Sequence, residues 1–427
     1  MTTELTCVMI GLGYIGLPTA VTMARHEMRV VGVDINEAIV RAVNSGACPI
    51  AEAGLPEALA TVVAGKRFRA RTTPTGGDVF VIAVPTPFEG GFKPDLSFVH
   101  AAALSIAPVL AKGNLVIVES TVPVAATEQV GRWLEAARPD LTFSRRGADG
   151  GRTADVMVAH CPERILPGQM MCELIENDRV IGGVCPPSAA RAQDFYRRFV
   201  KGDCLITDSR TAELCKLIEN SFRDVNIAFA NELSDICEQS DVNVWELIGL
   251  ANRHPRVNIL NPGPGVGGHC IAVDPWFIVS QLGDTTRLIR EARWINSNRP
   301  RSVVRKILER VKQGSVRSIA CFGLSYKANV DDLRESPAVE VVELLAKDLA
   351  LLETGIAITV VEPHIKSLPT VLRAAKNVTL GEIEQGLAAD LLVLLVDHRA
   401  FGHLPAIALA KKEIIDTRGV WRGAGRT

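Results

Sequence analysis

The chain has 427 residues, which is enough for two or three domains with sizeable cores. Lysine and arginine total 47 against 48 aspartates and glutamates, so the charge gives no reason to expect nucleic acid or a membrane as a partner. No apolar run reaches the ~20 residues that cross a bilayer. The first predicted strand begins at residue 5, so we expect no signal peptide, and the ten cysteines include no Cys-x-x-Cys pair. We therefore expect a cytoplasmic protein with reduced thiols.

The first apolar run opens a dinucleotide-binding pattern. Residues 5–10 predict a strand, residues 11–16 read Gly-Leu-Gly-Tyr-Ile-Gly, and residues 17–25 predict a helix. A second strand is predicted at residues 29–33 and ends at Asp34. Strand, G-x-G-x-x-G, helix, strand and acid follow one another as they do where this glycine motif binds a dinucleotide.

The residues of this pattern have separate roles. Gly11 permits a tight turn, Gly13 lets the backbone approach a pyrophosphate, and Gly16 allows the helix to pack closely. The N-terminus of the helix supplies amide donors to the phosphates. Asp34 can accept both ribose hydroxyls and would repel the 2′-phosphate of NADP, so the pattern predicts NAD as the cofactor.

Further strands follow at the spacing of a doubly wound sheet, at residues 78–84, 114–118, 155–160 and 179–181. Ligands on such sheets collect at the carboxyl ends of the strands, where we expect Thr86, Thr121 and Glu163. The alternatives are that the threonines are ordinary turn or cap residues and that Glu163 forms a surface pair with Arg164.

The pattern then changes to helices, of which residues 211–239 predict the longest. Lys216, Asn220 and Arg223 recur at i, i+4 and i+7 and therefore share one face of this helix. A solvated polar stripe is the alternative, but the neighbouring faces are strongly apolar. A long, mostly apolar helix between two α/β parts also suits a dimer interface.

Residues 261–275 place Cys270 directly after a run with four glycines, and Asp274 follows four residues later. A backbone so rich in glycine can approach a ligand closely and adopt positive φ angles. A thiol at the end of such a loop suggests a nucleophile beside a bound substrate. The alternative is a buried cysteine next to a tight turn.

The last third is again α/β, with strands predicted at residues 318–323, 356–361, 391–396 and 413–415. It carries no glycine fingerprint, so we expect no second dinucleotide there. Lys327, Arg334 and Arg418 lie at or just after strand ends, where they are well placed for phosphates. Ordinary surface charge is the alternative.

Several motifs together carry a resemblance. They are Gly-Leu-Gly-Tyr-Ile-Gly-Leu-Pro (11–18), Ala-Val-Pro-Thr-Pro (83–87), Glu-Ser-Thr (119–121), Leu-Arg-Glu-Ser-Pro (333–337) and the Gly-Gly-His-Cys loop with its aspartate. Over nearly its full length the chain resembles the NAD-dependent nucleotide-sugar 6-dehydrogenases, the family of UDP-glucose and GDP-mannose dehydrogenases. Residues 161–168, 220–226, 252–258 and 262–277 are similar to the branch that oxidises UDP-N-acetyl-D-mannosamine.

The resemblance implies an α/β protein of three domains. These are an N-terminal NAD-binding Rossmann domain (1–208), a central helical dimerisation and catalytic domain (209–305) and a C-terminal Rossmann-like domain that binds the UDP-sugar (306–427). It also implies a homodimer or higher homo-oligomer formed through the central helix, with neither nucleic acid, membrane nor metal involved.

The chemistry that the resemblance implies is four-electron oxidation of a sugar C6 alcohol to a carboxylate, with two NAD used in turn. Lys216 and Asp274 are the candidate bases of the first oxidation, directly or through water. Cys270 adds to the aldehyde as a thiohemiacetal, which is oxidised to a thioester. Lys216 and Asn220 stabilise the oxyanion, and Glu163 activates the water that hydrolyses the thioester.

Further roles follow from the resemblance alone. It assigns to NAD, besides the glycine loop, Tyr14, Ile15, Asp34, Thr86, Thr121, Thr127 and Arg334. It assigns to the UDP-sugar Arg164, Ile165, Lys216, Asn220, Arg223, His254, Arg256, Gly267, Tyr326, Lys327 and Arg418. Many family members have a second glutamate at the position of Pro167, which is expected to leave more of the hydrolysis to Glu163.

Three other readings remain open. The chain could be a two-electron dehydrogenase of the hydroxyacid or 6-phosphogluconate type with a structural Cys270. A zinc alcohol dehydrogenase could use His269, Cys270 and Asp274, although adjacent ligands are poorly spaced for one tetrahedral ion. A non-catalytic NAD-binding regulator could use Cys270 as a redox sensor. UDP-N-acetylglucosamine, UDP-glucose and GDP-mannose are the alternative substrates within the resembling family.

Overall fold

The computed structural model describes residues 5–90, 92–147, 154–165, 168–268, 270–410 and 412–421. The chain forms two compact units, Met1–Glu219 with Trp276–Gln281, and Asn220–Pro275 with Leu282–Thr427. The long helix α8 (Ser209–Gln239) contributes its first part to the first unit and the remainder to the second. Among the described residues, no helix combines the length and the apolar character needed to cross a bilayer.

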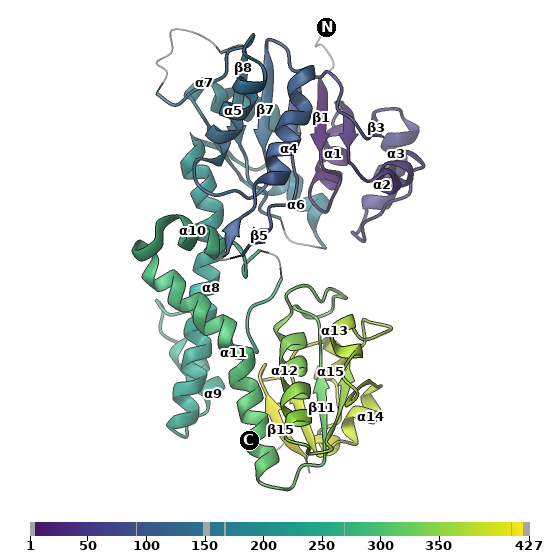
Figure 1. Cartoon of the computed structure of the whole chain (residues 1–427), viewed down its shortest axis with the longest axis vertical. Coiled ribbons are helices and arrows are strands. Elements are labelled where there is room, and N and C mark those ends of the chain that lie inside the picture. The colour runs from purple at the N-terminus through teal and green to yellow at the C-terminus, as the bar shows by residue number, and fades with distance from the viewer. Residues whose placement is uncertain are drawn as a thin grey trace. The chain divides into compact units, whose positions relative to one another are not determined.

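An eight-stranded sheet forms the centre of the first unit (Figure 1), in the order β10-β9-β8-β7-β4-β1-β2-β3. The strands are β1 (Thr6–Ile10), β2 (Arg29–Val33), β3 (Phe68–Arg71), β4 (Val79–Ile82), β7 (Asn114–Val118), β8 (Val156–His160), β9 (Arg179–Gly183) and β10 (Cys204–Asp208). Neighbouring strands pair in parallel except β8 and β9, so β9 and β10 run opposite to the rest.

Helices cover both faces of this sheet. They are α1 (Gly16–Arg25), α2 (Glu37–Asn44), α3 (Leu55–Ala64), α4 (Ser97–Ile106), α5 (Ala126–Ala137), α6 (Met170–Glu176) and α7 (Pro186–Tyr196). Cys7 and Met9 of β1 pack into a core shared with α1 and α3, whereas Val8 and Ile10 pack into another shared with α4 and α5. Because both faces are buried, the central strands are continuous apolar runs, as the sequence predicts.

The first unit also contains a short hairpin of β5 (Phe88–Glu89) and β6 (Lys93–Pro94). Phe92, between these strands, stacks on Trp276 with ring centroids 4.1 Å apart. Trp276 belongs to α10 (Asp274–Leu282), the helix that begins four residues after Cys270.

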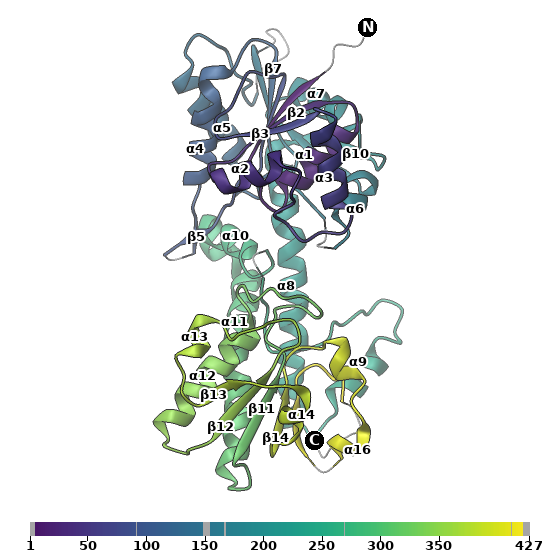
Figure 2. The same ribbon diagram turned by 90° about the vertical axis from the view of Figure 1, so that its right-hand side faces the viewer.

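The second unit contains α9 (Val244–Ala251), α11 (Arg287–Lys312) and a five-stranded parallel sheet (Figure 2), in the order β13-β12-β11-β14-β15. Its strands are β11 (Ser318–Phe322), β12 (Ala357–Val361), β13 (Val378–Leu380), β14 (Leu391–Leu394) and β15 (Glu413–Asp416). Its further helices are α12 (Pro337–Leu351), α13 (Thr370–Arg373), α14 (Ile383–Leu387), α15 (Arg399–Gly402) and α16 (Ala406–Leu409).

The α/β fold class with two Rossmann-like sheets is thus confirmed. Strands β3, β10 and β13 of these sheets, and the hairpin of β5 and β6, were not predicted. Residues of β3 alternate between buried and exposed, and the strand lies at the edge of its sheet, so it lacks the apolar run that marks the central strands. The reversal of β9 relative to β8 is also invisible in its apolar pattern.

Candidate active site

The glycine fingerprint adopts the geometry that its residue types predict. Gly11 has φ +96°, and a Cβ there or at Gly16 would collide with backbone atoms of the same turn and of Ala83. Gly13 is different, because a Cβ there would meet nothing within 4 Å. Space therefore lies over Gly13 at the N-terminus of α1, where a pyrophosphate would approach the backbone.

Asp34 lies at the carboxyl end of β2, beside the glycine turn. Its Oδ2 accepts a 3.0 Å hydrogen bond from the backbone of Leu12, and its Oδ1 accepts one of 2.8 Å from Asn36. The half-buried side chain keeps further acceptor capacity for ribose hydroxyls. Tyr14 and Ile15, just before α1, are also half-buried. These features fit NAD.

Two of the three predicted threonines lie together at the carboxyl ends of neighbouring strands β4 and β7. Thr86 Oγ1 donates a 2.7 Å hydrogen bond to the carbonyl of Thr121. Thr127 is instead completely buried, and its backbone N–H donates 2.7 Å to Glu213 Oε1. Glu213, which was not predicted as a functional residue, thus accepts hydrogen bonds from backbone N–H groups at the N-terminus of α5.

Glu163 follows β8 and is only 7% exposed. Its Oε2 accepts a 2.9 Å hydrogen bond from Arg179 Nη1, and its Oε1 accepts one of 2.6 Å from the backbone of Arg164. The Arg164 guanidinium pairs with Glu219 at 2.7 Å, so the surface pair considered for Glu163 is not formed. Ile165 is half-buried, and Pro167 lies outside the described residues.

The cysteine loop is held by buried polar side chains of α8 and α11. Asn231 Oδ1 accepts a 2.8 Å hydrogen bond from the backbone N–H of Gly263, and Arg299 Nε donates 3.1 Å to the carbonyl of the same residue. Arg293, on α11, donates 3.4 Å to the carbonyl of Ile271. Nothing in the spacing of these residues identified them as supports of the loop.

Glycines of this loop also pack against the C-terminal sheet domain. Gly268 has φ +81°, its N–H donates 3.2 Å to the carbonyl of Arg334, and a Cβ there would lie 2.9 Å from the Tyr326 ring. A Cβ at Gly267 would be 2.9 Å from Tyr326 Cβ, and one at Gly263 would be 2.6 Å from Arg418 Nη1. These glycines allow the cysteine loop to pack closely against other segments of the same unit, a role that was not predicted from the sequence.

Cys270 is exposed, so the alternative of a buried structural cysteine is wrong. Its carbonyl accepts a 2.9 Å hydrogen bond from the N–H of Asp274, the first residue of α10. The Asp274 side chain is 3% exposed, and Asn220 Nδ2 donates a 2.5 Å hydrogen bond to its Oδ2. Cys270, Asp274 and Asn220 therefore form one connected group in the second unit. His269 lies outside the described residues.

The remaining predicted residues differ in exposure. Lys216 is half-buried on the part of α8 that belongs to the first unit, whereas Arg223 is exposed in the second. His254 and Arg256 are exposed in the segment after α9.

The predicted nucleotide-binding residues follow β11 and β15. Tyr326 is half-buried and Lys327 exposed after β11. Arg418 follows β15, and its Nε donates 3.0 Å to Asp397 at the end of β14. Arg334 is exposed, and its guanidinium is paired with Asp332 at 2.6 Å.

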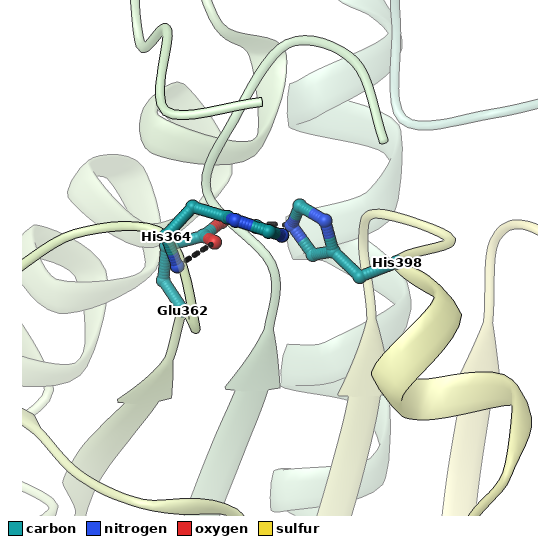
Figure 3. Close-up of side chains that lie close together, drawn as sticks. All are labelled: Glu362, His364 and His398. Atoms are coloured by element: carbon teal, nitrogen blue, oxygen red, sulfur yellow. Dashed lines mark hydrogen bonds and ion pairs between the residues drawn. The ribbon is translucent and has the colours of Figure 1, made fainter. Parts of the chain in front are cut away.

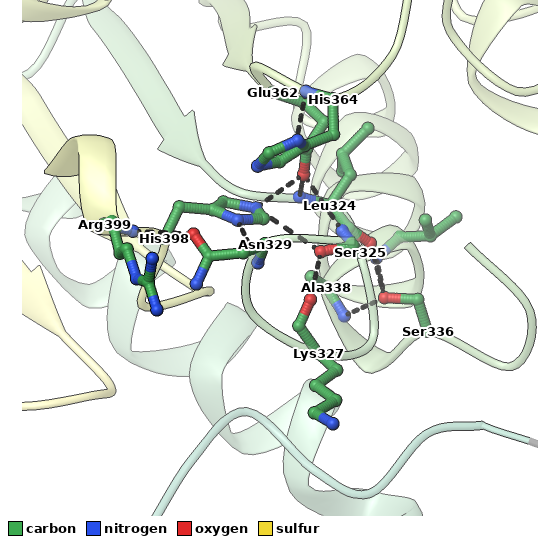
Figure 4. A network of polar contacts seen from close by, with 11 residues as sticks. Leu324, Ser325, Lys327, Asn329, Ser336, Ala338, Glu362, His364, His398 and Arg399 are labelled. Carbon is green, nitrogen blue, oxygen red and sulfur yellow. Dashed lines mark hydrogen bonds and ion pairs between the residues drawn. The ribbon is translucent and has the colours of Figure 1, made fainter. Parts of the chain in front are cut away.

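A buried Glu362–His398 pair fixes the segment that carries Lys327 (Figures 3 and 4). Glu362 Oε2 accepts from His398 Nε2 at 3.0 Å and from the backbone of Leu324 at 2.7 Å. His398 Nδ1 accepts from the backbone of Asn329 at 2.8 Å. Ser325 Oγ donates 2.7 Å to the carbonyl of Lys327. Both ends of this segment are thereby tied to neighbouring strand ends.

Glu362, His364 and His398 group as possible metal ligands among the described residues. Because His398 Nδ1 accepts a backbone N–H, its Nε2 carries the proton and donates to Glu362. Neither ring nitrogen therefore offers a free lone pair to an ion. The group is suited to bracing the loop and not to binding a metal.

The model of the UDP-glucose/GDP-mannose dehydrogenase family matches the chain in three parts. Its NAD binding domain matches residues 5–200, its central domain residues 210–298 and its UDP binding domain residues 320–423. The chain belongs to this family. It is an NAD-dependent nucleotide-sugar dehydrogenase, as the resemblance of its motifs implies.

Individual relatives match this dehydrogenase over nearly its full length. A UDP-N-acetyl-D-mannosamine dehydrogenase of Salmonella typhi is 54% identical over 97% of this chain and 98% of the relative. An NDP-N-acetyl-D-galactosaminuronic acid dehydrogenase of Ralstonia nicotianae is 54% identical over 96% of this chain and 95% of the relative. The solved structure of the UDP-D-ManNAc dehydrogenase from Pyrococcus horikoshii has a TM-score of 0.84 at 37% identity, covering 98% of this chain and 96% of that one.

Proposed function

We propose that this dehydrogenase oxidises the C6 alcohol of UDP-N-acetyl-D-mannosamine to the carboxylate of UDP-N-acetyl-D-mannosaminuronate. The observation that carries the chemistry is the exposed Cys270, four residues before Asp274, whose carboxylate is held by Asn220. The substrate is inferred from the Salmonella typhi and Pyrococcus horikoshii relatives.

The reaction removes four electrons and adds one water oxygen to C6. NAD, when bound, accepts a hydride from C6 in each of the two oxidations. Lys216, or Asp274 through a water, removes the hydroxyl proton in the first oxidation. Cys270 Sγ then adds to the aldehyde, and the resulting thiohemiacetal loses its hydroxyl proton as it is oxidised to the thioester.

Holding the aldehyde on Cys270 explains how one site carries out both oxidations. Lys216 and the Asn220 amide supply positive charge and a donor for the oxyanion. Glu163 takes a proton from the water that hydrolyses the thioester. Gly13, Asp34, Thr86 and the start of α1 hold NAD, and Lys327 and Arg418 bind the diphosphate.

Product stoichiometry tests the chemistry. We expect two NADH for each sugar consumed, together with one sugar carboxylate. One NADH per sugar with a stable aldehyde or ketone product would contradict the thioester route and favour the two-electron alternative.

The Ralstonia relative, equally identical, makes the galactosamine sugar the strongest competing substrate. We therefore propose an assay of UDP-N-acetyl-D-mannosamine against UDP-N-acetyl-D-galactosamine, UDP-N-acetylglucosamine, UDP-glucose and GDP-mannose. The highest kcat/KM is expected for the mannosamine sugar. A higher value for another member of the panel would replace the substrate but leave the chemistry in place.

We also propose that two copies of the chain associate through α8. Phe222, Phe229 and Ile236 lie seven residues apart on one side of this helix and are 68%, 54% and 52% exposed. Trp294 of α11 is 62% exposed as well. Exposed apolar stripes of this kind usually mark a protein interface. Sedimentation of wild type and Phe229→Glu tests it, since the variant should shift toward monomer.

A further inference from the structure

A group of buried polar side chains lies behind Glu163 in the first unit. Glu119 directly follows β7, Cys161 and Glu163 follow β8, Arg179 begins β9, and Tyr196 ends α7. Each of these residues is at most 7% exposed. Helix α7 packs on β7, β8 and β9, so the four elements enclose the group.

The reversal of β9 brings Arg179 to this position. In the antiparallel pairing of β8 with β9, Ala159 lies opposite Gly183 and His160 opposite Gly182. Continued for three residues, this register places Arg179 opposite Glu163. The amino end of β9 therefore meets the carboxyl ends of β7 and β8 at the ligand edge of the sheet.

The group contains one cation and two carboxyl groups. Arg179 Nη1 donates 2.9 Å to Glu163 Oε2, and its Nη2 donates 3.3 Å to the carbonyl of Leu174. Tyr196 donates 3.3 Å to Glu119 Oε1. Among the described residues, Glu119 Oε2 and Arg179 Nε have no hydrogen-bond partner. The positive charge of one buried guanidinium neutralises the negative charge of one carboxylate but not of two.

The ion pair identifies which carboxyl group is charged. Burial and the negative charge of Glu163 raise the pKa of Glu119 to about 8, although Arg179 and the Tyr196 hydroxyl act in the opposite direction. At neutral pH Glu119 is therefore protonated, and Glu163 is the carboxylate that balances Arg179.

The other titratable side chains of this region stay neutral. Burial raises the pKa of Cys161 to about 12 and that of Tyr196 well above its usual value. Burial lowers the pKa of His160 to about 3. The charged Arg164 is paired with Glu219 instead of with this group. Glu119 is thus the member whose charge changes above neutral pH.

We propose that Arg179 and Glu119 are positioning residues for thioester hydrolysis: Arg179 orients Glu163 as a carboxylate, and Glu119 leaves the cation to Glu163 by remaining uncharged. This inference rests on the proposed role of Glu163 as the base. An ionised Glu119 competes for the guanidinium and weakens its hold on Glu163.

Hydrolysis of the thioester consumes one water and regenerates Cys270. The water oxygen forms a bond to the thioester carbonyl carbon, and Glu163 takes one water proton. The carbon–sulfur bond breaks, and its electron pair returns to Cys270 Sγ as a thiolate. The sugar acid and Glu163 then each release a proton to solvent. Oε1 and Oε2 of Glu163 each accept one hydrogen bond, so the carboxylate retains lone pairs for the water.

The test follows acyl-Cys270 by intact mass after mixing enzyme, UDP-N-acetyl-D-mannosamine and NAD and quenching in acid, between pH 6 and pH 9. Arg179→Met should slow acyl-enzyme decay ~10- to 100-fold at pH 7, because the Glu163 carboxylate loses the guanidinium that orients it. Arg179→Lys keeps the charge and should recover part of the rate. Decay at the wild-type rate in both variants would overturn the proposal.

Glu119→Gln tests the second residue without adding a charge. The acyl-enzyme decay rate of the variant, divided by that of wild type, should rise between pH 7 and pH 9, because only the wild type gains a negative charge at this position as the pH increases. A ratio that does not change with pH overturns the role of Glu119. This variant keeps the size and neutral charge of the protonated side chain, so folding is expected to be preserved.

Glu163→Gln separates this inference from the function on which it rests. It should accumulate acyl-Cys270 at every pH. If it does not, the base role of Glu163 is wrong and the inference falls with it. If it does, while Arg179→Met and Arg179→Lys decay as wild type, only the inference is wrong.

Discussion

The amide of Asn220 donates a 2.5 Å hydrogen bond to the carboxylate of Asp274, and this bond joins α8 to the first turn of α10. Asn220→Ala removes the bond and leaves the 3% exposed Asp274 without this donor. A hydrogen bond to a charged group contributes ~1.5–3 kcal/mol, so we expect kcat to fall about tenfold or more. Asn226→Ala is the control on the same helix, since the Asn226 amide donates to the carbonyl of Phe222 within that helix. Equal kcat values for the two variants would contradict a role for the Asn220–Asp274 pair.

Cys270→Ser tests the covalent step. Loss of the thiol should reduce carboxylate formation by ~10³-fold or more, as for removal of other covalent nucleophiles. Titration of NAD should give the wild-type Kd, because the fingerprint is unaltered. Cys172→Ser is the control, since Cys172 is also exposed but lies on α6. A Cys270→Ser enzyme that still formed the carboxylate at the wild-type rate would refute the mechanism.

Asp34 should determine the choice of cofactor. Asp34→Asn keeps an acceptor for the N–H of Leu12 but removes the negative charge that we propose binds the ribose hydroxyls. We expect KM for NAD to rise ~10-fold and the preference over NADP to shrink. Glu37→Gln removes a charge nearby, where Glu37 forms an exposed pair with Arg41, and should leave both values unchanged. Unaltered discrimination in Asp34→Asn would exclude this role.

Gly268→Ala should disrupt the packing of the cysteine loop. A left-handed conformation costs a non-glycine residue ~1–2 kcal/mol, and the new methyl group would press on Tyr326. We expect a lower Tm and a loss of activity together. Gly249→Ala, in α9, meets nothing within 4 Å and should be neutral or stabilising. If both variants had the wild-type Tm, the close packing at Gly268 would not contribute to the stability of the protein.

Because of Glu362, the C-terminal sheet domain should become less stable at acidic pH. Burial acts to raise the pKa of Glu362, but His398 and the backbone N–H groups outweigh it, so the pKa is lowered. The stabilisation is therefore present above the ordinary glutamate value of about 4.3 and is lost as pH falls through the folded-state pKa.

Glu362→Gln should lower Tm at pH 7, flatten its decline below about pH 4, and raise KM for the UDP-sugar more than it lowers kcat. His364→Ala removes the exposed neighbour and should change none of these. A wild-type Tm profile in Glu362→Gln would show that the pair with His398 does not brace the Lys327 segment.

Much of the fold follows from local patterns in the sequence. The apolar runs of β1, β2, β4 and β7 are bounded by turn residues, and Gly11, Gly13 and Gly16 stand between strand and helix, so each identifies its element without distant contacts. Edge strands such as β3 and β13 escape this reasoning, because they are short and only partly buried. The direction of β9 could not be predicted either, because an apolar pattern does not indicate whether a strand will be parallel or antiparallel to its neighbours.

The candidate site was predictable where its residues are neighbours in sequence, share a helix face or follow the strands of a parallel sheet. Cys270 and Asp274 were accessible in this way. Arg179 was not, because its ion pair with Glu163 depends on the pairing of two strands. Nor could Asn231 and Arg299 be assigned to the cysteine loop, since their contacts with Gly263 depend on how α8 and α11 fold around it.

Gly268 lies close against the ring of Tyr326, next to Lys327 in sequence. The segment that presents the thiol rests directly on the segment that carries Lys327, within one compact unit. With the roles proposed for Lys327 and Cys270, the distance between the diphosphate and the thiol is fixed within this unit. A nucleotide sugar whose reacting carbon lies at another distance from its diphosphate would then not reach the sulfur, even if each end could bind alone.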